Sequence, residues 1–171
     1  MSVAGKAWVF GDNIDTDVLA PGLYMKGPLK VLAQHCLEAV DPDFATNVCA
    51  GDVIVAEENF GIGSSREQAV QALQFLGVRT LVAKSFAGIF FRNALNFGVV
   101  ALTCPEADRI SPGDQISADA QSGVITNHTN GETYSCQPLP DQLLVMVTDG
   151  GLVAHLEKKL AAKTHKQEAA S

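Results

Sequence analysis

Apolar and polar positions divide the chain into short buried segments and amphipathic ones. Apolar runs of strand length stand at 5–10, 53–56, 80–84 and 99–102. Runs of this length between turn residues are typical of buried strands. Between them, apolar residues repeat with the period of a helix at 29–40, 66–76 and 86–97. This alternation of buried strands and helices predicts a mostly parallel sheet that is covered on both faces.

The pattern changes after Pro105. Polar and apolar residues alternate from 114 to 136, around turn signals at 121–123 and 130–131. Alternation interrupted by such turns predicts a small antiparallel meander, and one or two helices are expected at 140–160. The whole pattern predicts an α/β fold of three layers with a small antiparallel β appendage. We expect a single domain over residues 1–160 and a flexible C-terminal tail at 161–171.

The charge balance limits the classes of partner. Of the 171 residues, 47% are hydrophobic and 18% are charged, which is enough apolar material for one domain with a real core. The 19 acidic residues outnumber the 12 Lys and Arg, which disfavours nucleic acid or an anionic membrane as partner. No apolar run approaches the ~20 residues of a transmembrane helix, and the N-terminus does not resemble a secretory signal. A cytoplasmic enzyme, or a subunit of one, is the expected class.

The four cysteines stand far apart in the sequence, at Cys36, Cys49, Cys104 and Cys136. They form no C-x-x-C pair, although zinc and iron–sulfur sites usually contain at least one close pair of ligands. We therefore expect that the chain binds no metal or other cofactor by itself. Free thiols in a reducing compartment are the simpler interpretation.

The segment NFGIGSSRE, residues 59–67, follows a predicted strand and precedes a predicted helix. Gly61 and Gly63 allow the backbone to turn sharply and to approach a ligand closely. A helix N-terminus attracts anions through its free N–H groups and its dipole. Ser64 and Ser65 add hydroxyl groups, and Arg66 adds a planar cation that suits a carboxylate. Together these features predict a pocket for a small carboxylate or phosphate.

Other interpretations of this segment stay open on spacing alone. A serine at a helix start often serves only as an N-cap, here with Glu67 completing a capping box. A module that binds a carboxylate without catalysis is a second alternative. A hydrolase with Ser64 as nucleophile is disfavoured, because no plausible His and Asp partners are apparent. The segment also lacks the lysine of a Walker A loop and the spacing of a G-x-S-x-G elbow.

A second candidate element follows the first predicted strand. This stretch, GDNIDTD at 11–17, is followed by a short Pro- and Gly-containing segment with an aromatic, an apolar and a basic residue. A solvated loop with Asx-turns and helix caps is the alternative interpretation. The candidate residues of this element are Asp12, Asp15, Thr16, Asp17, Tyr24, Met25 and Lys26.

The segments GDNIDTD at 11–17, NFGIGSSREQA at 59–69 and AKSFAGIFFRNALNFG at 83–98 resemble three successive signatures of one enzyme family. They are similar to the small subunits of 3-isopropylmalate dehydratase and to the swivel domain of aconitase and homoaconitase. The resemblance covers nearly the whole chain, and the second and third segments are highly specific in combination. It implies the swivelling β/β/α fold of aconitase domain 4.

This resemblance implies a hydro-lyase, which removes water from a hydroxy di- or tricarboxylic acid and adds it back. A [4Fe-4S] cluster on a separate large subunit would bind the substrate hydroxyl, in a heterodimer or heterotetramer that is active only when complete. On this chain the resemblance implies Ser64 as the catalytic base that removes a proton next to a carboxylate. It implies that Ser65 and Arg66 hold a substrate carboxylate, with Gly61, Gly63 and the 12–17 loop in support.

The resemblance also implies a substrate-selecting segment at residues 24–26, where relatives that act on isopropylmalate often have Tyr-Leu-Arg. The sequence departs from the family pattern at Ile62, Gln68 and Gly88, where Cys, His and Arg are common. The expected substrate is 3-isopropylmalate, formed from 2-isopropylmalate in leucine biosynthesis. A related alkylmalate such as 2,3-dimethylmalate is the alternative that these departures favour.

Overall fold

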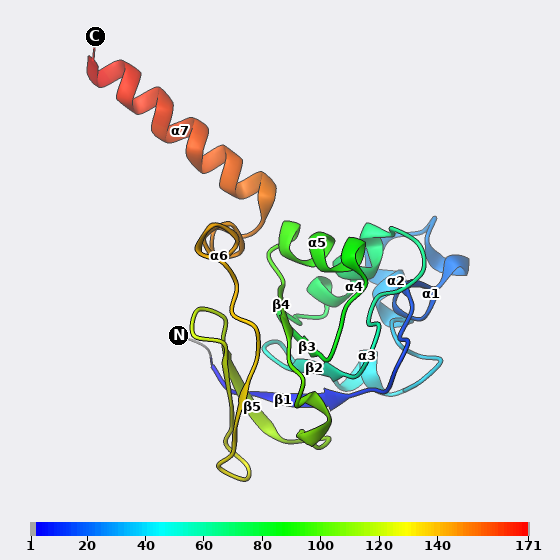
Figure 1. Ribbon diagram of the computed structural model, residues 1–171. Helices are drawn as coiled ribbons and strands as arrows, with labels where there is room; N and C mark the ends of the chain where they lie inside the picture. The colour runs from blue at the N-terminus through cyan, green and yellow to red at the C-terminus, as the bar shows by residue number, and fades with distance from the viewer. Residues whose placement is uncertain (1–2, 171) are drawn as a thin grey trace.

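The structure is a computed structural model that describes residues 3–170. These residues form a seven-stranded sheet with the strand order β4-β3-β2-β1-β5-β6-β7 (Figure 1). The strands are β1 (Gly5–Val9), β2 (Val53–Ala56), β3 (Thr80–Ala83), β4 (Val100–Thr103), β5 (Gln115–Asp119), β6 (Val124–Asn127) and β7 (Thr133–Ser135).

The strands β1 to β4 form the parallel half of the sheet. In β2, Ile54 lies opposite Trp8 of β1 on one side and Leu81 of β3 on the other. All four residues of β2 are buried, because apolar cores cover both of its faces. The four strands that the sequence predicts are thus confirmed to within one residue at each end.

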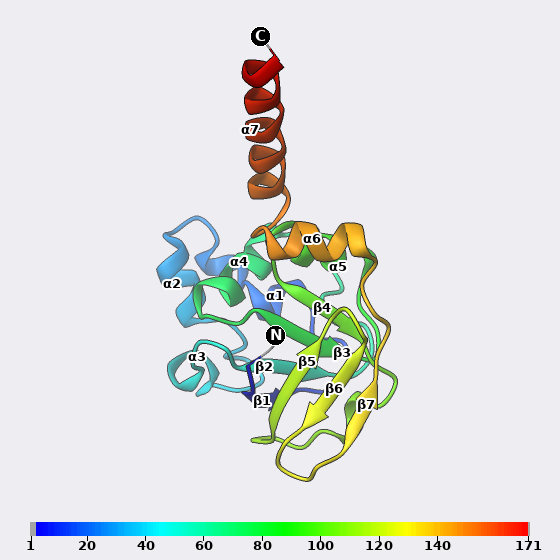
Figure 2. The ribbon, with the colours of Figure 1, turned by 90° about the vertical axis from the view of Figure 1, so that its left-hand side faces the viewer.

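The strands β5 to β7 form the antiparallel half, which β1 joins to the parallel half by pairing with β5. This confirms the predicted meander and its two turns. The antiparallel half folds across one face of the parallel strands (Figure 2). Its side chains Ile116, Ile125 and Tyr134 pack in one core with Val53 and Val55 of β2.

The helices cover the opposite face of the parallel strands. Because consecutive residues of a strand point to opposite faces, Ile54 packs in a second core, together with Leu81 and the helix residue Leu73. The layers are therefore antiparallel strands, parallel strands and helices, as the β/β/α expectation requires. The elements on the helix side are α1 (Thr16–Leu19), the 3-10 helix η1 (Gly22–Tyr24), α2 (Leu29–Gln34), α3 (Phe44–Asn47), α4 (Glu67–Phe75) and α5 (Gly88–Asn96), while the 3-10 helix η2 (Ala107–Arg109) follows β4.

The helix predicted at 29–40 is too long, because α2 ends at Gln34. Leu37 adopts a left-handed backbone with φ of 62°, which a helix does not allow. Its N–H group donates to the carbonyl of Val18 at 2.9 Å instead of continuing the helix. Leu37 is fully buried, so packing of this side chain overrides the local helical pattern.

The chain closes with α6 (Asp141–Thr148) and α7 (Leu152–Ala170), and α7 projects away from the body of the molecule (Figures 1 and 2). Residues 161–170, which belong to the stretch expected to be a flexible tail, are helical, because Ala, Lys, Gln and Glu favour helix. Their side chains are exposed, and both their mobility and the domain boundary at 160 stay predictions. Over residues 3–170, no helix is long and apolar enough to cross a membrane.

Asp149 connects the first two turns of α7 to the end of α6. Its carboxylate oxygens lie 2.7 Å from His155 Nδ1 and 2.9 Å from Lys158 Nζ. These hydrogen bonds, with His155 first, hold the pKa of Asp149 below its ordinary value. A carboxyl whose pKa is lowered by folding adds stability above its unfolded pKa, and that stability is lost as pH falls through the folded pKa.

We expect Asp149→Asn to lower the free energy of unfolding at neutral pH, because the charge that holds His155 and Lys158 is removed. Below about pH 4 the difference from the wild type should shrink, since the carboxyl of the unfolded chain then binds a proton while the folded carboxyl does so only at lower pH. Urea unfolding followed by circular dichroism at several pH values measures this. Glu157→Gln, an exposed change on the same helix, is the control. A difference that persists unchanged to about pH 3 would contradict the assigned role.

Candidate functional site

The loops that follow β1 and β2 meet at the carboxyl end of the parallel strands. The N–H of Gly61 donates to the carbonyl of Ile14 at 2.7 Å, and the N–H of Thr16 donates to the carbonyl of Ile62 at 2.9 Å. These bonds form a short parallel bridge between Asp15 and Ile62. The two candidate segments, far apart in the sequence, therefore lie side by side at the sheet edge where open α/β sheets bind ligands.

Thr16 positions the turn that contains the two serines. Its side chain is buried, and its Oγ1 accepts a hydrogen bond from the N–H of Ser64 at 3.1 Å. A Cβ atom at Gly63 would lie only 3.0 Å from this oxygen, and the φ of Gly63 is +109°. Asp15, the residue before Thr16, fixes the start of α1, because its carboxylate accepts a hydrogen bond from the N–H of Val18 at 2.9 Å and caps this helix. The loop thus orders the serine turn through backbone contacts.

The hydroxyl groups of Ser64 and Ser65 are not used to cap a helix. Helix α4 begins at Glu67 with Arg66 as its N-cap residue, and no side chain caps it. The capping-box interpretation of Ser64 and Glu67 is therefore wrong. Both serines are exposed, and within residues 3–170 neither hydroxyl has a hydrogen-bond partner. They are free to contact a ligand.

Arg66 is held from one side only. Its Nη1 forms an ion pair with Asp17 and donates to the carbonyl of Ala20 at 3.2 Å. The Asp17 side chain is 70% exposed, so this pair adds little to stability. Nη2 and Nε have no partner in the described part of the chain. One edge of the guanidinium fork is therefore available to a planar carboxylate.

Side chains also connect the two loops close to the points where they leave β1 and β2. The carboxylate of Asp12 accepts from the N–H of Glu58 at 2.9 Å, and the amide of Asn59 donates to Oδ1 of Asn13 at 3.1 Å. The two asparagines both have positive φ, 57° and 60°. Neither asparagine was predicted from the sequence to belong to the site, although asparagine just before a turn is a signal for a left-handed backbone.

Residues 24–26 lie on the 3-10 helix η1 and the turn after it. The ring of Tyr24 stacks on His35 with centroids 3.6 Å apart, and Met25 packs against the helix-side core. Lys26 is exposed, and so is Leu23, which was not among the predicted site residues and is 84% exposed. Over residues 3–170, no hydrogen bond or ion pair joins residues 24–26 to 64–66. The contact of this segment with a substrate stays a prediction.

The turn rests on a cluster of aromatic rings. Phe60, the residue before Gly61, packs edge-on against Phe90 at 5.3 Å and against Phe86 at 6.0 Å between centroids. The φ of Gly61 is +83°, and a Cβ atom there would lie 2.1 Å from Phe90 Cγ. Only glycine fits this close approach, so the aromatic rings determine how closely the backbone of the turn packs on α5.

No histidine serves Ser64 as a base. His35 pairs with Glu38, His155 with Asp149 and His165 with Glu168, while His128 lies 2.9 Å from the hydroxyl of Ser117. Within residues 3–170, Ser64 has no hydrogen bond to any of them. The hydrolase alternative therefore lacks the constellation that it requires.

The cysteines of this chain do not fit an iron–sulfur cluster. Over residues 3–170, no group of three or more His, Cys, Asp or Glu is placed to hold a metal ion. Burial raises the pKa of the Cys136 thiol to about 11 and raises that of Cys36 well above its ordinary value. Iron is bound by thiolates, and burial disfavours their formation at Cys36 and Cys136.

Comparison with known proteins places the fold in the aconitase class. The aconitase C-terminal domain family matches residues 31–107, which include the serine turn and α5. A crystal structure of 3-isopropylmalate dehydratase (leuD) from Methanocaldococcus jannaschii superposes with a TM-score of 0.91. That chain is 40% identical, and the match covers 97% of this chain and 99% of the other. The molecule is thus an aconitase-type swivel domain.

Curated relatives define the class further. The 3-isopropylmalate dehydratase small subunit of Methanosarcina mazei is 48% identical over 93% of this chain and 99% of its own length. The 2,3-dimethylmalate dehydratase small subunit of Eubacterium barkeri is 45% identical over 91% and 97%. The chain therefore belongs to the family of 3-isopropylmalate dehydratase-type small subunits, which confirms the resemblance seen in the sequence and its hydro-lyase class.

We expect Gly61→Ala to lower the free energy of unfolding by roughly 2–4 kcal/mol, because the new methyl group meets Phe90 and the left-handed backbone strains any other residue. Gly22→Ala is the matched control, since a Cβ atom at Gly22 meets nothing within 4 Å. It should change stability by less than about 0.5 kcal/mol. Urea unfolding of both variants tests this, and equal stabilities would contradict the close approach.

Proposed function

We propose that this chain is the small subunit of a hydro-lyase that converts 2-isopropylmalate to 3-isopropylmalate through isopropylmaleate, a step of leucine biosynthesis. The relatives named for 3-isopropylmalate dehydratase support this substrate. A relative named for 2,3-dimethylmalate dehydratase, at 45% identity, supports the alternative alkylmalate. One observation carries the proposal: at residues 64–66, two uncommitted serine hydroxyls stand beside a guanidinium with one open edge.

Arg66 binds a carboxylate of the substrate in this proposal. Asp17 and the Ala20 carbonyl occupy Nη1, so the Nη2–Nε edge keeps the parallel donors that suit a bidentate carboxylate. The hydroxyl of Ser65 supplies a further donor. Asp17 acts as a positioning residue, because it fixes the guanidinium without occupying the open edge.

Ser64 is the base that removes a proton from the carbon next to the carboxylate. A serine alkoxide is very unfavourable in water, so this role needs a cation nearby and a site from which water is excluded. Arg66 supplies the cation. Ser64 is exposed in the free chain, and a second protein must therefore cover it before its charge can be stabilised.

The large subunit supplies that cover and the cofactor. We propose a heterodimer or heterotetramer in which the partner carries a [4Fe-4S] cluster, whose iron acts as a Lewis acid toward the leaving hydroxyl. The poor fit of this chain's own cysteines supports a cluster held elsewhere. Four free cysteines suit a reducing compartment, which supports a cytoplasmic location.

Residues 24–26 are proposed to face the variable side of the substrate. Tyr24 and Met25 pack against the body, which leaves Lys26 as the charged group that can reach a carboxylate. Leu23 offers an exposed apolar surface to an alkyl group. A point charge at Lys26 contacts a carboxylate without the planar fork of arginine.

The decisive experiment reconstitutes the chain anaerobically with a cluster-bearing large subunit and measures dehydration of 3-isopropylmalate and 2,3-dimethylmalate. We expect Ser64→Ala to lower kcat by about 10²–10⁴-fold with little change in KM, because the base acts only in the transition state. Ser111→Ala, an exposed change far from the turn in sequence, is the control. Near-normal turnover of a correctly assembled Ser64→Ala enzyme would remove Ser64 from the mechanism.

We expect Arg66→Lys to raise KM by roughly 10–100-fold, because a point charge replaces the two parallel donors of the fork. Arg79→Lys, on the exposed surface before β3, should leave KM unchanged. Steady-state kinetics of the same reconstituted enzyme measures both. An unchanged KM in Arg66→Lys would show that this guanidinium does not bind the substrate carboxylate.

A further inference from the structure

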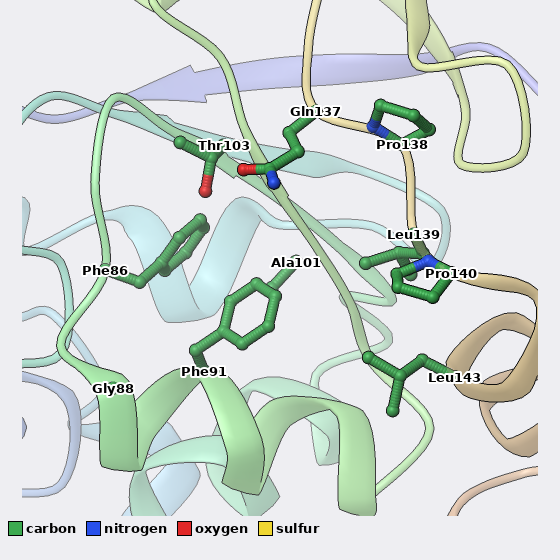
Figure 3. A pocket seen from close by; sticks show the side chains of 10 residues that line it. All are labelled: Phe86, Gly88, Phe91, Ala101, Thr103, Gln137, Pro138, Leu139, Pro140 and Leu143. Atoms are coloured by element: carbon green, nitrogen blue, oxygen red, sulfur yellow. The ribbon is translucent and has the colours of Figure 1, made fainter.

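A cavity of about 420 Å³ opens between α5, β4 and the segment that leads into α6 (Figure 3). Ligand sites for small organic molecules commonly enclose about 300–1,000 Å³. None of the residues assigned to the hydro-lyase reaction lines this cavity. It is a separate feature of the molecule, and its own walls indicate what it can bind.

The walls of the cavity are aromatic on one side and aliphatic on the other. Phe86 and Phe91, with ring centroids 5.8 Å apart, form the aromatic side, and Leu139 and Leu143 face them across the space (Figure 3). Flat rings and branched side chains gain dispersion energy from a planar or branched apolar group placed between them. We therefore expect these walls to suit a ligand whose main part is apolar.

Two neutral polar groups stand at one end of the cavity. The N–H of Gln137 donates to the carbonyl of Thr103 at 2.9 Å, which brings the two residues together. The Thr103 hydroxyl and the Gln137 amide lie next to each other at the cavity (Figure 3). Within residues 3–170, neither side chain has a hydrogen-bond partner. Together they offer both donors and acceptors to a ligand.

The lining contains no charged side chain. Gln137 and Pro138 at the rim are exposed, so a carboxylate or ammonium that entered would lose part of its hydration, and it would gain no opposite charge in return. An amide or alcohol loses much less and regains its hydrogen bonds from Thr103 and Gln137. The chemistry of the walls thus selects a neutral polar group over an ionised one.

Gly88, the first residue of α5, keeps one side of the cavity clear. A Cβ atom at this position would meet nothing within 4 Å. A larger side chain is therefore accepted here without a clash, at a position that lines the cavity. This position offers a way to close the cavity without disturbing the fold.

We propose that this cavity is a binding site for a small neutral molecule with an apolar body and one amide or hydroxyl group. The site is also connected to the serine turn. Phe86, on its aromatic wall, contacts Phe60 at 6.0 Å between centroids, and Phe60 directly precedes Gly61. A bound ligand therefore presses on the same ring cluster that supports the turn.

Benzamide and benzoate form a matched pair of probes, equal in shape and different in charge. Each is titrated into the full chain alone, and the backbone amide signals are followed by two-dimensional NMR. We expect benzamide to shift the signals of Phe86, Phe91, Thr103 and Gln137, with a smaller shift at Gly61. Benzoate should bind at least about tenfold more weakly, because its charge has no partner in the cavity.

Variants of the lining residues test whether benzamide binds in this cavity. Gly88→Met should weaken benzamide binding about tenfold or more by filling the cavity, whereas Ile89→Met, exposed on the same helical turn, should leave it unchanged. Thr103→Val should weaken it by roughly 2–10-fold. The proposal is overturned if benzamide does not bind, if its shifts map elsewhere, if benzoate binds equally well, or if Gly88→Met has no effect. The large subunit is absent throughout, so the result is independent of the dehydratase assignment.

Discussion

The pairing of two loops holds the candidate site together. The loop after β1 and the loop after β2 exchange backbone hydrogen bonds on both sides of Asp15, and Thr16 binds the N–H of Ser64 from a buried position. These backbone hydrogen bonds do not depend on which side chains the exposed positions of the loops carry. The backbone of the serine turn takes its position from this contact, whereas Asp17 and the Ala20 carbonyl hold the guanidinium of Arg66.

The parallel and antiparallel halves of the sheet have different structural roles. The parallel half delivers the loops of the site, because the carboxyl ends of β1 and β2 lie at the same edge. The antiparallel half carries none of the assigned residues and buries the other face of β2 with Ile116, Ile125 and Tyr134. It therefore supports the strands that position the candidate site, while the candidate residues stand on the loops after β1 and β2.

Much of the fold could be predicted because the signals are local. The run at 53–56 is apolar at every position, and the structure buries it on both faces as a central parallel strand. The short α2 could not be predicted, since the left-handed backbone of Leu37 depends on a hydrogen bond to Val18, which packing brings near. Local periodicity carries no information about such a contact.

The same distinction applies to the site. A ligand site at residues 61–66 could be proposed from the sequence, but spacing alone also allowed a simple helix cap, and the family resemblance was needed to choose between them. The pairing of Arg66 with Asp17 could not be predicted from the sequence, since it depends on how far β1 and β2 are shifted relative to each other. The sequence also suggested a serine cap for α4, but this helix begins at Glu67 with Arg66 at its N-cap position.

The position of β1 in the sheet has a consequence for synthesis of the protein. This strand lies between β2 and β5, and so its two hydrogen-bonding edges are filled by segments made at very different times. On the ribosome, the first edge can close once residue 56 has emerged, but the second stays open until residue 119 has followed. The nascent chain therefore carries an uncovered strand edge through much of its elongation, and open edges of this kind are where chains associate wrongly.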